Sequence, residues 1–200
     1  MKKLKMSIIF TAIALSILLA TQVNLAPAET TGNDDLPEPQ TPYINIFADF
    51  YGIDGESIDE DHENWIDLKS FDFYMNQPAR GVSGISRRRG DVQFEDITLT
   101  KGVDKATPKL MDKLARGQVI DTVTIEFSRY IADGNKVFYK YELENVLITS
   151  YQSSASIEDY PEDTLTLNFE EIKVTYTEYD DDGTSMGNVE WEWKVETGGA

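Results

Sequence analysis

Residues 122–144 read TVTIEFSRYIADGNKVFYKYELE, and this stretch determines the expected fold class. Apolar and polar side chains alternate along it at a period of two, which is typical of a strand that buries one face. The alternation is interrupted at Ala132-Asp133-Gly134-Asn135, whose composition favours a hairpin turn. We therefore predict two antiparallel strands joined at 132–135. The apolar faces comprise Val123, Ile125 and Phe127 on the first strand and Val137, Tyr139, Tyr141 and Leu143 on the second.

The same alternation continues on both sides of this hairpin, at residues 44–50 and again at 189–195 after a turn at 180–188. Three further runs change parity partway with no turn residue between, which suggests a β-bulge in each. Bulges bend strands and help a sheet to close into a barrel. We predict a mainly β protein, a small antiparallel barrel or tightly packed sandwich. The expected buried faces are Ile44, Ile46, Ala48 and Phe50, and Val189, Trp191, Trp193 and Val195; the runs that change parity are 66–73, 92–99 and 165–176.

One segment has helical periodicity. Thr107 is the expected N-cap, Pro108 occupies the first helical position, and Gly117 stands just past the end. An apolar stripe between these signals predicts one α-helix that packs on the side of the barrel. The stripe consists of Leu110, Met111, Leu114 and Ala115.

The N-terminus has the layout of a secretory signal peptide, with three lysines, an apolar stretch and the small residues Ala26-Pro27-Ala28 before Glu29. An uncleaved anchor helix over 4–25 is the alternative, although polar residues dilute that stretch. The next segment is acidic, contains prolines and has almost no apolar side chains, which predicts a flexible leader. The expected division is a signal peptide at 1–28, a leader at 29–42 and one domain at 43–197.

Charge and cysteine content exclude several classes of function. Without the three lysines of the signal peptide, 36 acidic residues face 15 basic ones, a formal charge of −21. Such a chain repels phosphate backbones, so we expect no nucleic-acid partner. The absence of cysteine excludes disulfides, thiolate metal sites and cysteine nucleophiles.

Candidate catalytic groups are sparse. The single histidine, His62, lies among the acids Asp59, Glu60, Asp61 and Glu63. A small secreted hydrolase that uses His62 with Asp59 or Asp61 is one hypothesis. A loop histidine bonded to a neighbouring carboxylate or carbonyl is the structural interpretation, and the absence of a second histidine favours it. We therefore expect no enzymatic activity, with no catalytic residue, cofactor or metal.

Three other motifs are each open to two interpretations. Residues 180–185, DDDGTS, resemble a calcium loop superficially, but their spacing favours a turn between strands. Arg87-Arg88-Arg89 is the one strong basic cluster, and it suits either an acidic surface on an identical subunit or a solvated loop. Trp191 and Trp193 lie on one strand face, where they form either a carbohydrate-binding platform or, with their aliphatic neighbours, part of the core.

A series of short pieces, in order, covers nearly all of Tyr43 to Val195. They are Gly55-Glu56-Ser57, His62, Trp65-Ile66, Phe71-Asp72-Phe73, Gln77-Pro78, Val92-Gln93-Phe94-Glu95-Asp96, Thr100-Lys101, Asp104-Lys105-Ala106-Thr107-Pro108-Lys109-Leu110, Glu144-Asn145-Val146, Leu165 to Phe169, Ile172-Lys173-Val174-Thr175-Tyr176, and Gly187-Asn188-Val189 with Trp193. In this order they resemble the haemolysin-coregulated protein (Hcp) family of type VI secretion systems.

The resemblance implies a small β-barrel with one flanking helix, six copies of which form a ring. Stacked rings make the inner tube of a contractile injection machine, without enzymatic activity, and hold small effector proteins in the lumen for export. The loop at 52–64 would contact neighbouring subunits or stacked rings, and Asp72 would face the lumen. The candidate contacts are Glu56, Ser57 and His62 in this loop, together with Arg87, Arg88 and Arg89.

The predicted signal peptide departs from the family, whose tube subunits assemble in the cytoplasm. We expect a secreted or periplasmic protein, with no membrane attachment after cleavage, whereas a role in a tube would require the cytoplasm. The alternative function is a secreted β-sandwich module that binds carbohydrate or protein.

Overall fold

The computed structural model describes residues 43–80, 88–89, 92–132 and 134–195. The predicted signal peptide and leader lie outside the described residues, as does Arg87. All described residues belong to one compact unit, Gln40–Ala200.

The described part of the chain contains twelve strands and one helix. They are β1 (Ile44–Phe50), β2 (Ile66–Asp72), β3 (Met75–Asn76), β4 (Ala79–Arg80), β5 (Arg88–Arg89), β6 (Gln93–Phe94), β7 (Ile97–Gly102), α1 (Thr107–Arg116), β8 (Ile120–Ile131), β9 (Gly134–Ser154), β10 (Glu162–Asn168), β11 (Glu171–Tyr179) and β12 (Ser185–Lys194).

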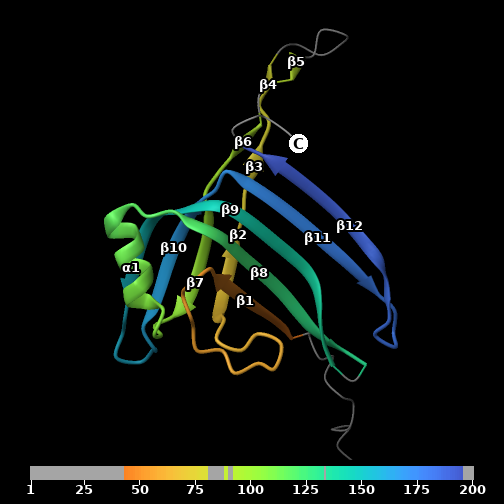
Figure 1. The fold of residues 1–200 in the computed structure, drawn as a ribbon, viewed down its shortest axis with the longest axis horizontal. Coiled ribbons are helices and arrows are strands. Elements are labelled where there is room, and N and C mark those ends of the chain that lie inside the picture. Colours follow the sequence, from red (N-terminus) through yellow and green to blue (C-terminus); the bar gives the residue numbers. More distant parts are fainter. Residues whose placement is uncertain (1–42, 81–87, 90–91, 133, 196–200) are drawn as a thin grey trace, which may run out of the picture. The chain divides into compact units, whose positions relative to one another are not determined.

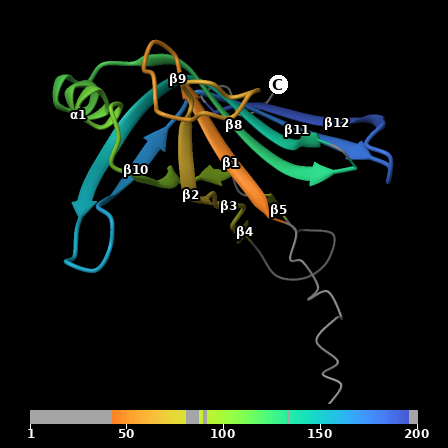
Figure 2. The same ribbon diagram turned by 90° about the horizontal axis from the view of Figure 1, so that it is seen from below.

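Eight strands form one antiparallel sheet in the order β10-β7-β2-β1-β8-β9-β11-β12. Because β10 also pairs with β9, the six strands from β10 to β9 close into a barrel, which confirms the predicted fold class. The remaining two strands, β11 and β12, form an extension hairpin that continues the sheet away from the barrel (Figures 1 and 2). The predicted hairpin of β8 and β9 is confirmed as well.

Strand β9 links the barrel to the extension hairpin. It is 21 residues long, and one of its edges pairs with β8. The other edge is divided, because residues 139–144 pair with β11 and residues 147–154 pair with β10. Asn145 lies at this division with a φ of 54°, and its side chain donates a hydrogen bond of 2.7 Å to Glu170. Asparagine tolerates this left-handed conformation better than most residues do.

Of the three predicted bulges, one is confirmed. The pairing of β2 with β7 shifts register between Leu68 and Ser70. The other two predictions are wrong. At each of these changes of parity one strand ends and a new strand begins. Residues 95–96 separate β6 from β7, and residues 169–170 separate β10 from β11. Further register shifts occur where β10 meets β9 and where β8 meets β9.

The barrel interior is aliphatic, and its fully buried side chains come from every strand of the closed sheet. Strand β1 departs from the predicted alternation. Ala48 and Phe50 are buried as expected, but Ile44 is 49% exposed and Phe47 is only 4% exposed. Phe47 points away from the barrel interior, where the ring of His62 covers it. The largest buried aliphatic residues are Ile66, Ile97, Leu99, Leu110, Ile120, Ile125, Leu143, Leu165, Leu167 and Ile172.

Helix α1 packs against β9 as predicted, and Gly117 ends it with a φ of 58°. Two details of the prediction are wrong. The N-cap is Ala106 and not Thr107, and the backbone N–H of Ala106 donates to the side chain of Asp104. The predicted apolar stripe of the helix is only partly buried against the barrel. Leu110 is buried, but Met111 is 46% exposed. Within the described ranges, no helix is long and apolar enough to cross a membrane.

A buried ionic cluster holds the start of the helix on the barrel. The Lys101 side chain is fully buried, and its Nζ lies 2.7 Å from Asp104 Oδ1 and 3.4 Å from Asp163 Oδ2. Thr107, which was the expected N-cap, accepts a hydrogen bond from Lys101 and donates one to Asp163. Burial alone would raise the pKa of Asp163, but hydrogen bonds from Thr107 and Tyr151 and the charge of Lys101 lower it below its usual value.

The conformation of Asn145 gives a first prediction. Asn145→Val should lower the free energy of unfolding by about 1–2 kcal/mol, because a β-branched residue is strained at positive φ. Asn145→Gly should cost less, since glycine adopts this conformation without strain. Chemical denaturation of both variants measures the difference. An equal loss in both would mean that the bond to Glu170, and not the backbone conformation, makes this position sensitive.

Candidate functional site

Two exposed features of the fold are candidates for function. One is the 51–65 loop, which connects β1 to β2 and carries three of the predicted contact residues. The other is the extension hairpin, whose last strand, β12, is an edge of the described sheet.

The 51–65 loop folds back on itself through backbone hydrogen bonds. The N–H of Gly55 donates to the carbonyl of Asn64 at 2.7 Å, and the N–H of Ser57 donates to Trp65 at 2.9 Å. A Cβ atom at residue 55 would lie 2.3 Å from the backbone oxygen of Trp65, so only glycine fits there. Asn64 has a φ of 65°, which turns the chain back toward β2.

His62 forms the interior of this loop and is 2% exposed. Its ring stacks on Phe47 of β1, with centroids 4.1 Å apart and planes 10° apart, and meets Trp65 edge-on. Its Nδ1 lies 2.7 Å from Asp59 Oδ1 in the same loop, and its Nε2 lies 3.0 Å from Glu126 Oε2 on β8. Asp59 is the neighbouring carboxylate that the structural interpretation expected, whereas Glu126 was not anticipated as a partner.

The polar side chains in contact with the His62 ring are both carboxylates. Both ring nitrogens face carboxylates, so neither is directed at a hydroxyl nucleophile. Burial alone would raise the pKa of Asp59, but hydrogen bonds from His62 and from the backbone of Asp61 lower it below its usual value. The Asn135 side chain donates a further hydrogen bond to Asp59 from the start of β9.

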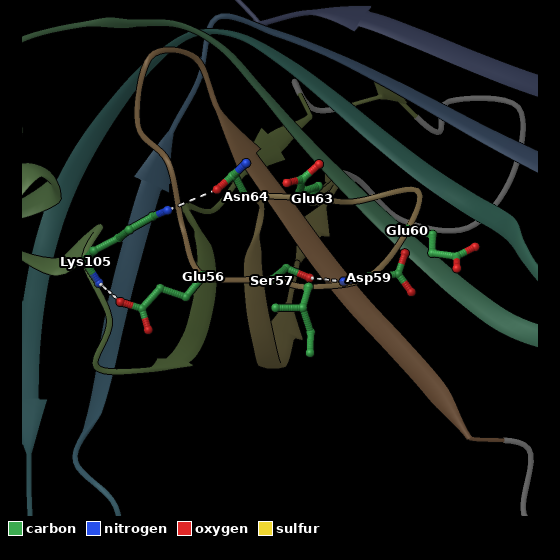
Figure 3. A pocket seen from close by; sticks show the side chains of 8 residues that line it. Glu56, Ser57, Asp59, Glu60, Glu63, Asn64 and Lys105 are labelled. Atoms are coloured by element: carbon green, nitrogen blue, oxygen red, sulfur yellow. Dashed lines mark hydrogen bonds between the residues drawn. The ribbon is translucent and has the colours of Figure 1, made fainter.

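The outer surface of the loop borders an open, mainly acidic pocket (Figure 3). Lys105 binds both sides of the loop: its backbone N–H donates to Glu56 at 3.0 Å and its Nζ donates to Asn64 at 3.1 Å. Ile58 is 96% exposed at this surface. The pocket is lined by Glu56, Ser57, Ile58, Asp59, Glu60, Glu63, Asn64 and Lys105.

The predicted contact residues differ in their accessibility. Glu56 is exposed, whereas Ser57 and His62 are 4% and 2% exposed, so these two shape the loop and are not available for direct contact with a partner. Arg88 and Arg89 form β5, which pairs with β4 in the arm that leaves the barrel beyond β3 and β6 (Figure 1).

Asp72 is exposed at the end of β2, as alternation predicts. Its neighbours Phe71 and Phe73 are partly buried and pack against the barrel core. Alternation therefore identifies the solvent-facing residue correctly.

The extension hairpin presents an apolar face that begins in the core and ends in solvent. Trp193 is half-buried and packs with Phe94, while its neighbour Trp191 is 36% exposed. Farther along the same face of β12, Val189 is 72% exposed, and opposite it on β11 Tyr176 is 44% exposed. The prediction that this face is core is correct for Trp193 and wrong for Val189. We call Tyr176, Val189 and Trp191 the hairpin patch.

Residues 180–184 form the turn between β11 and β12, which is shorter than the predicted turn at 180–188 because residues 185–188 belong to β12. The N–H of Thr184 donates to the side chains of Asp180 and Asp182, and Gly183 has a φ of 81°. These bonds fold the acidic side chains onto their own backbone. Among the described residues, no group of three or more histidine or acidic side chains has the arrangement of a metal site.

Comparisons with known proteins agree with the fold. The family described as "Type VI secretion system effector, Hcp" matches residues 44–176. The protein hcp1 of Pseudomonas aeruginosa is 27% identical over 154 residues, which cover 76% of this chain and 95% of that protein. A solved type six secretion system protein has a TM-score of 0.72 at 25% identity, covering 78% of this chain and 98% of the other. Hcp1 from Salmonella typhimurium has the same fold, with a TM-score of 0.64 at 22% identity over 77% and 96% of the two chains.

The close approach at Gly55 gives a second prediction. Gly55→Ala should destabilise the protein by about 1–3 kcal/mol, because the added methyl group displaces the backbone of Trp65. Gly134→Ala is the matched control, since a Cβ there has nothing within 4 Å. Thermal unfolding of both variants measures the effect. Equal stabilities would show that the loop accommodates the methyl group and is not held as closely as described.

Proposed function

Because this chain belongs to the Hcp family of type VI secretion system proteins, we propose that it is a non-enzymatic structural protein whose copies close into a ring of six. Family membership supports the type VI secretion context. The ring itself is supported by a feature of this chain, the hairpin patch, and by the edge that β12 leaves unpaired among the described strands.

The hairpin patch is the observation that carries this proposal. It consists of large apolar side chains in a row that continues the barrel core outward through Trp193 and Phe94. Removal of such a row from water by another surface is favourable, because burial of apolar side chains lowers the free energy of the assembly. A second copy of this chain fits best, because a self-complementary pairing of patch and barrel would repeat from copy to copy.

Repetition of one head-to-tail contact closes into a ring when the rotation between copies divides a full turn. In such a ring every hairpin patch is covered by the next subunit. The exposed part of the 51–65 loop around Glu56, together with the basic residues Arg87, Arg88 and Arg89, would supply further contacts between copies. In that arrangement the basic arm meets an acidic neighbour, which is favourable electrostatically.

We further propose that the ring carries small effector proteins in its lumen. Asp72 would face the inner wall, where six copies would favour basic or polar cargo over acidic cargo. We also propose that the predicted signal peptide is cleaved and that the ring acts outside the cytoplasm, in the periplasm or beyond. An exported protein is separated from any tube that assembles in the cytoplasm. This chain would therefore have a role outside the cytoplasm that differs from that of a tube subunit.

A secreted carbohydrate-binding module is the second candidate function, but the tryptophan geometry favours it less. A platform needs both rings of Trp191 and Trp193 open to the ligand. Both rings instead contact Phe94 and Trp193 is half-buried, so the two rings do not form an open platform.

The ring proposal predicts the effect of a single added charge. Val189→Asp should dissociate the ring into folded monomers, because it introduces a carboxylate into the hairpin patch. Asn188→Asp is the matched control: it adds the same charge to the neighbouring position on the opposite face of β12 and should leave the ring intact. Light scattering of the mature protein and both variants measures the assembly.

The same light-scattering measurement across a series of salt concentrations gives a second test of the ring. Six copies, each with a formal charge of −21, repel one another, so assembly should strengthen as the ionic strength rises. A wild-type protein that stays monomeric at every salt and protein concentration would contradict the proposed ring.

The proposed export predicts a specific N-terminus. Protein recovered from the periplasm or medium of a Gram-negative host should begin at or near Glu29, as intact-mass measurement would report. Recovery of the full-length chain in the membrane fraction would support the anchor helix instead.

A further inference from the structure

Helix α1 has exposed apolar side chains on the side that faces away from the barrel. Leu110 is buried in the barrel core, whereas Met111 is 46% exposed and Ala115 is exposed one turn later. Residues three or four apart share one side of a helix, so the exposed Pro108 extends this side toward the start of α1. Val119, just after the helix, is 47% exposed. We call Pro108, Met111, Ala115 and Val119 the helix stripe.

Basic residues border the helix stripe. In an otherwise acidic chain, residues 105–116 contain one acid, Asp112, and four basic residues. Lys109 and Arg116 are exposed on the helix. Arg116 pairs with Asp112 at 2.8 Å, whereas no hydrogen bond or ion pair links Lys109 to another described residue. The four basic residues are Lys105, Lys109, Lys113 and Arg116.

The extension hairpin has the opposite charge. Residues 176–192 contain six acids and no basic residue. Glu178 is exposed and follows Tyr176 on the same face of β11, because side chains alternate along a strand. The hairpin patch therefore has a carboxylate beside it on its own face. The six acids are Glu178, Asp180, Asp181, Asp182, Glu190 and Glu192.

Helix α1 and the extension hairpin lie on opposite sides of the barrel (Figures 1 and 2). A chain therefore cannot bring its own hairpin to its own helix, and a contact between these two elements joins two copies. Such a contact is head-to-tail, because it uses different surfaces on the two partners. Each copy keeps a free helix at one end and a free hairpin at the other, so the contact repeats until the ring closes.

We propose that the helix stripe of each copy covers the hairpin patch of the next copy. This inference rests on the proposed ring and names the surface that covers the patch. Apolar side chains meet at the centre of the contact, where both surfaces leave water. Around them the basic border of α1 meets the acidic residues of the hairpin. An apolar centre with a charged rim is the usual anatomy of a protein interface.

The distribution of charge favours this pairing over the two symmetric ones. Two hairpins in contact would bring acidic residues together, and two helices in contact would bring basic residues together, so both arrangements are unfavourable. Whole chains still repel one another at a distance, since each has a formal charge of −21. Salt screens this repulsion and the local attraction alike, so charge reversal at a fixed ionic strength is needed to isolate the local attraction.

Cysteine cross-linking tests the contact directly, because the chain contains no cysteine. The mature double variant Met111→Cys/Val189→Cys has one thiol in the helix stripe and one in the hairpin patch. A short bismaleimide should join successive copies into a ladder of covalent species of up to six chains, whereas either single variant should give none. The matched control, Met111→Cys/Asn188→Cys, moves the second thiol to the opposite face of β12 and should give no ladder.

Charge reversal gives a second test that leaves the apolar centre unchanged. Lys109→Glu and Glu178→Lys should each raise the protein concentration needed for half-assembly by about tenfold at constant ionic strength, because each variant places like charges across the contact. Glu178→Lys is the sharper variant, since it lowers the overall repulsion and would strengthen assembly if net charge alone mattered. The double variant Lys109→Glu/Glu178→Lys should recover most of the wild-type assembly. Light scattering measures assembly, and circular dichroism checks that each variant is folded.

The outcomes separate this contact from the ring itself. Rings in which Met111→Cys/Val189→Cys gives no ladder, or a folded Glu178→Lys variant that assembles at least as well as the wild type, would overturn the contact and leave the ring standing. A cross-link in Val189→Cys alone would show that hairpin meets hairpin, which also overturns it. A protein that forms no ring at any concentration refutes both proposals.

Discussion

The structure depends on the divided edge of β9. Because residues 139–144 bind β11 and residues 147–154 bind β10, one strand both closes the barrel and carries the extension hairpin. Asn145 marks the division with a backbone conformation that a regular strand does not use. Closure buries the aliphatic faces of six strands, whereas on the hairpin Phe94 of β6 contacts Trp191 and Trp193 and Val189 stays 72% exposed. Its apolar side chains therefore extend from the core into solvent, where the proposed ring would cover them.

Buried polar clusters attach the surface elements to this barrel. Lys101 and Asp163 hold the start of α1, and His62 with Glu126 holds the 51–65 loop. In both clusters a buried side chain lies at hydrogen-bond distance from carboxylates, an arrangement that is costly when a partner is removed. The clusters thereby determine where the helix and the loop lie, while the aliphatic core supplies the favourable free energy of burial.

Much of the fold could be predicted from periodicity. The alternation at 122–144 correctly predicted the hairpin of β8 and β9, and the signals around Pro108 and Gly117 correctly predicted the helix. Changes of parity were ambiguous, because a bulge and a break between two strands leave the same local pattern. The partner of His62 could not be found from the sequence, since Glu126 is 64 residues away and looks like an ordinary solvent-facing position on its strand. Lys101 did carry a signal, because it continues the inward series of Ile97 and Leu99, where a charged side chain needs a buried partner. The exposure of Val189 also escaped prediction, since alternation identifies a face but not what covers it.

The central claim is that copies of this chain cover one another's extension hairpins in a closed ring. Electron microscopy of the purified mature protein tests it most directly. We expect ring particles with sixfold symmetry and an open centre, with the hairpin patch of each subunit lying against the barrel of the next. Particles the size of a single chain, or rings in which the hairpin patches remain exposed, would contradict the claim.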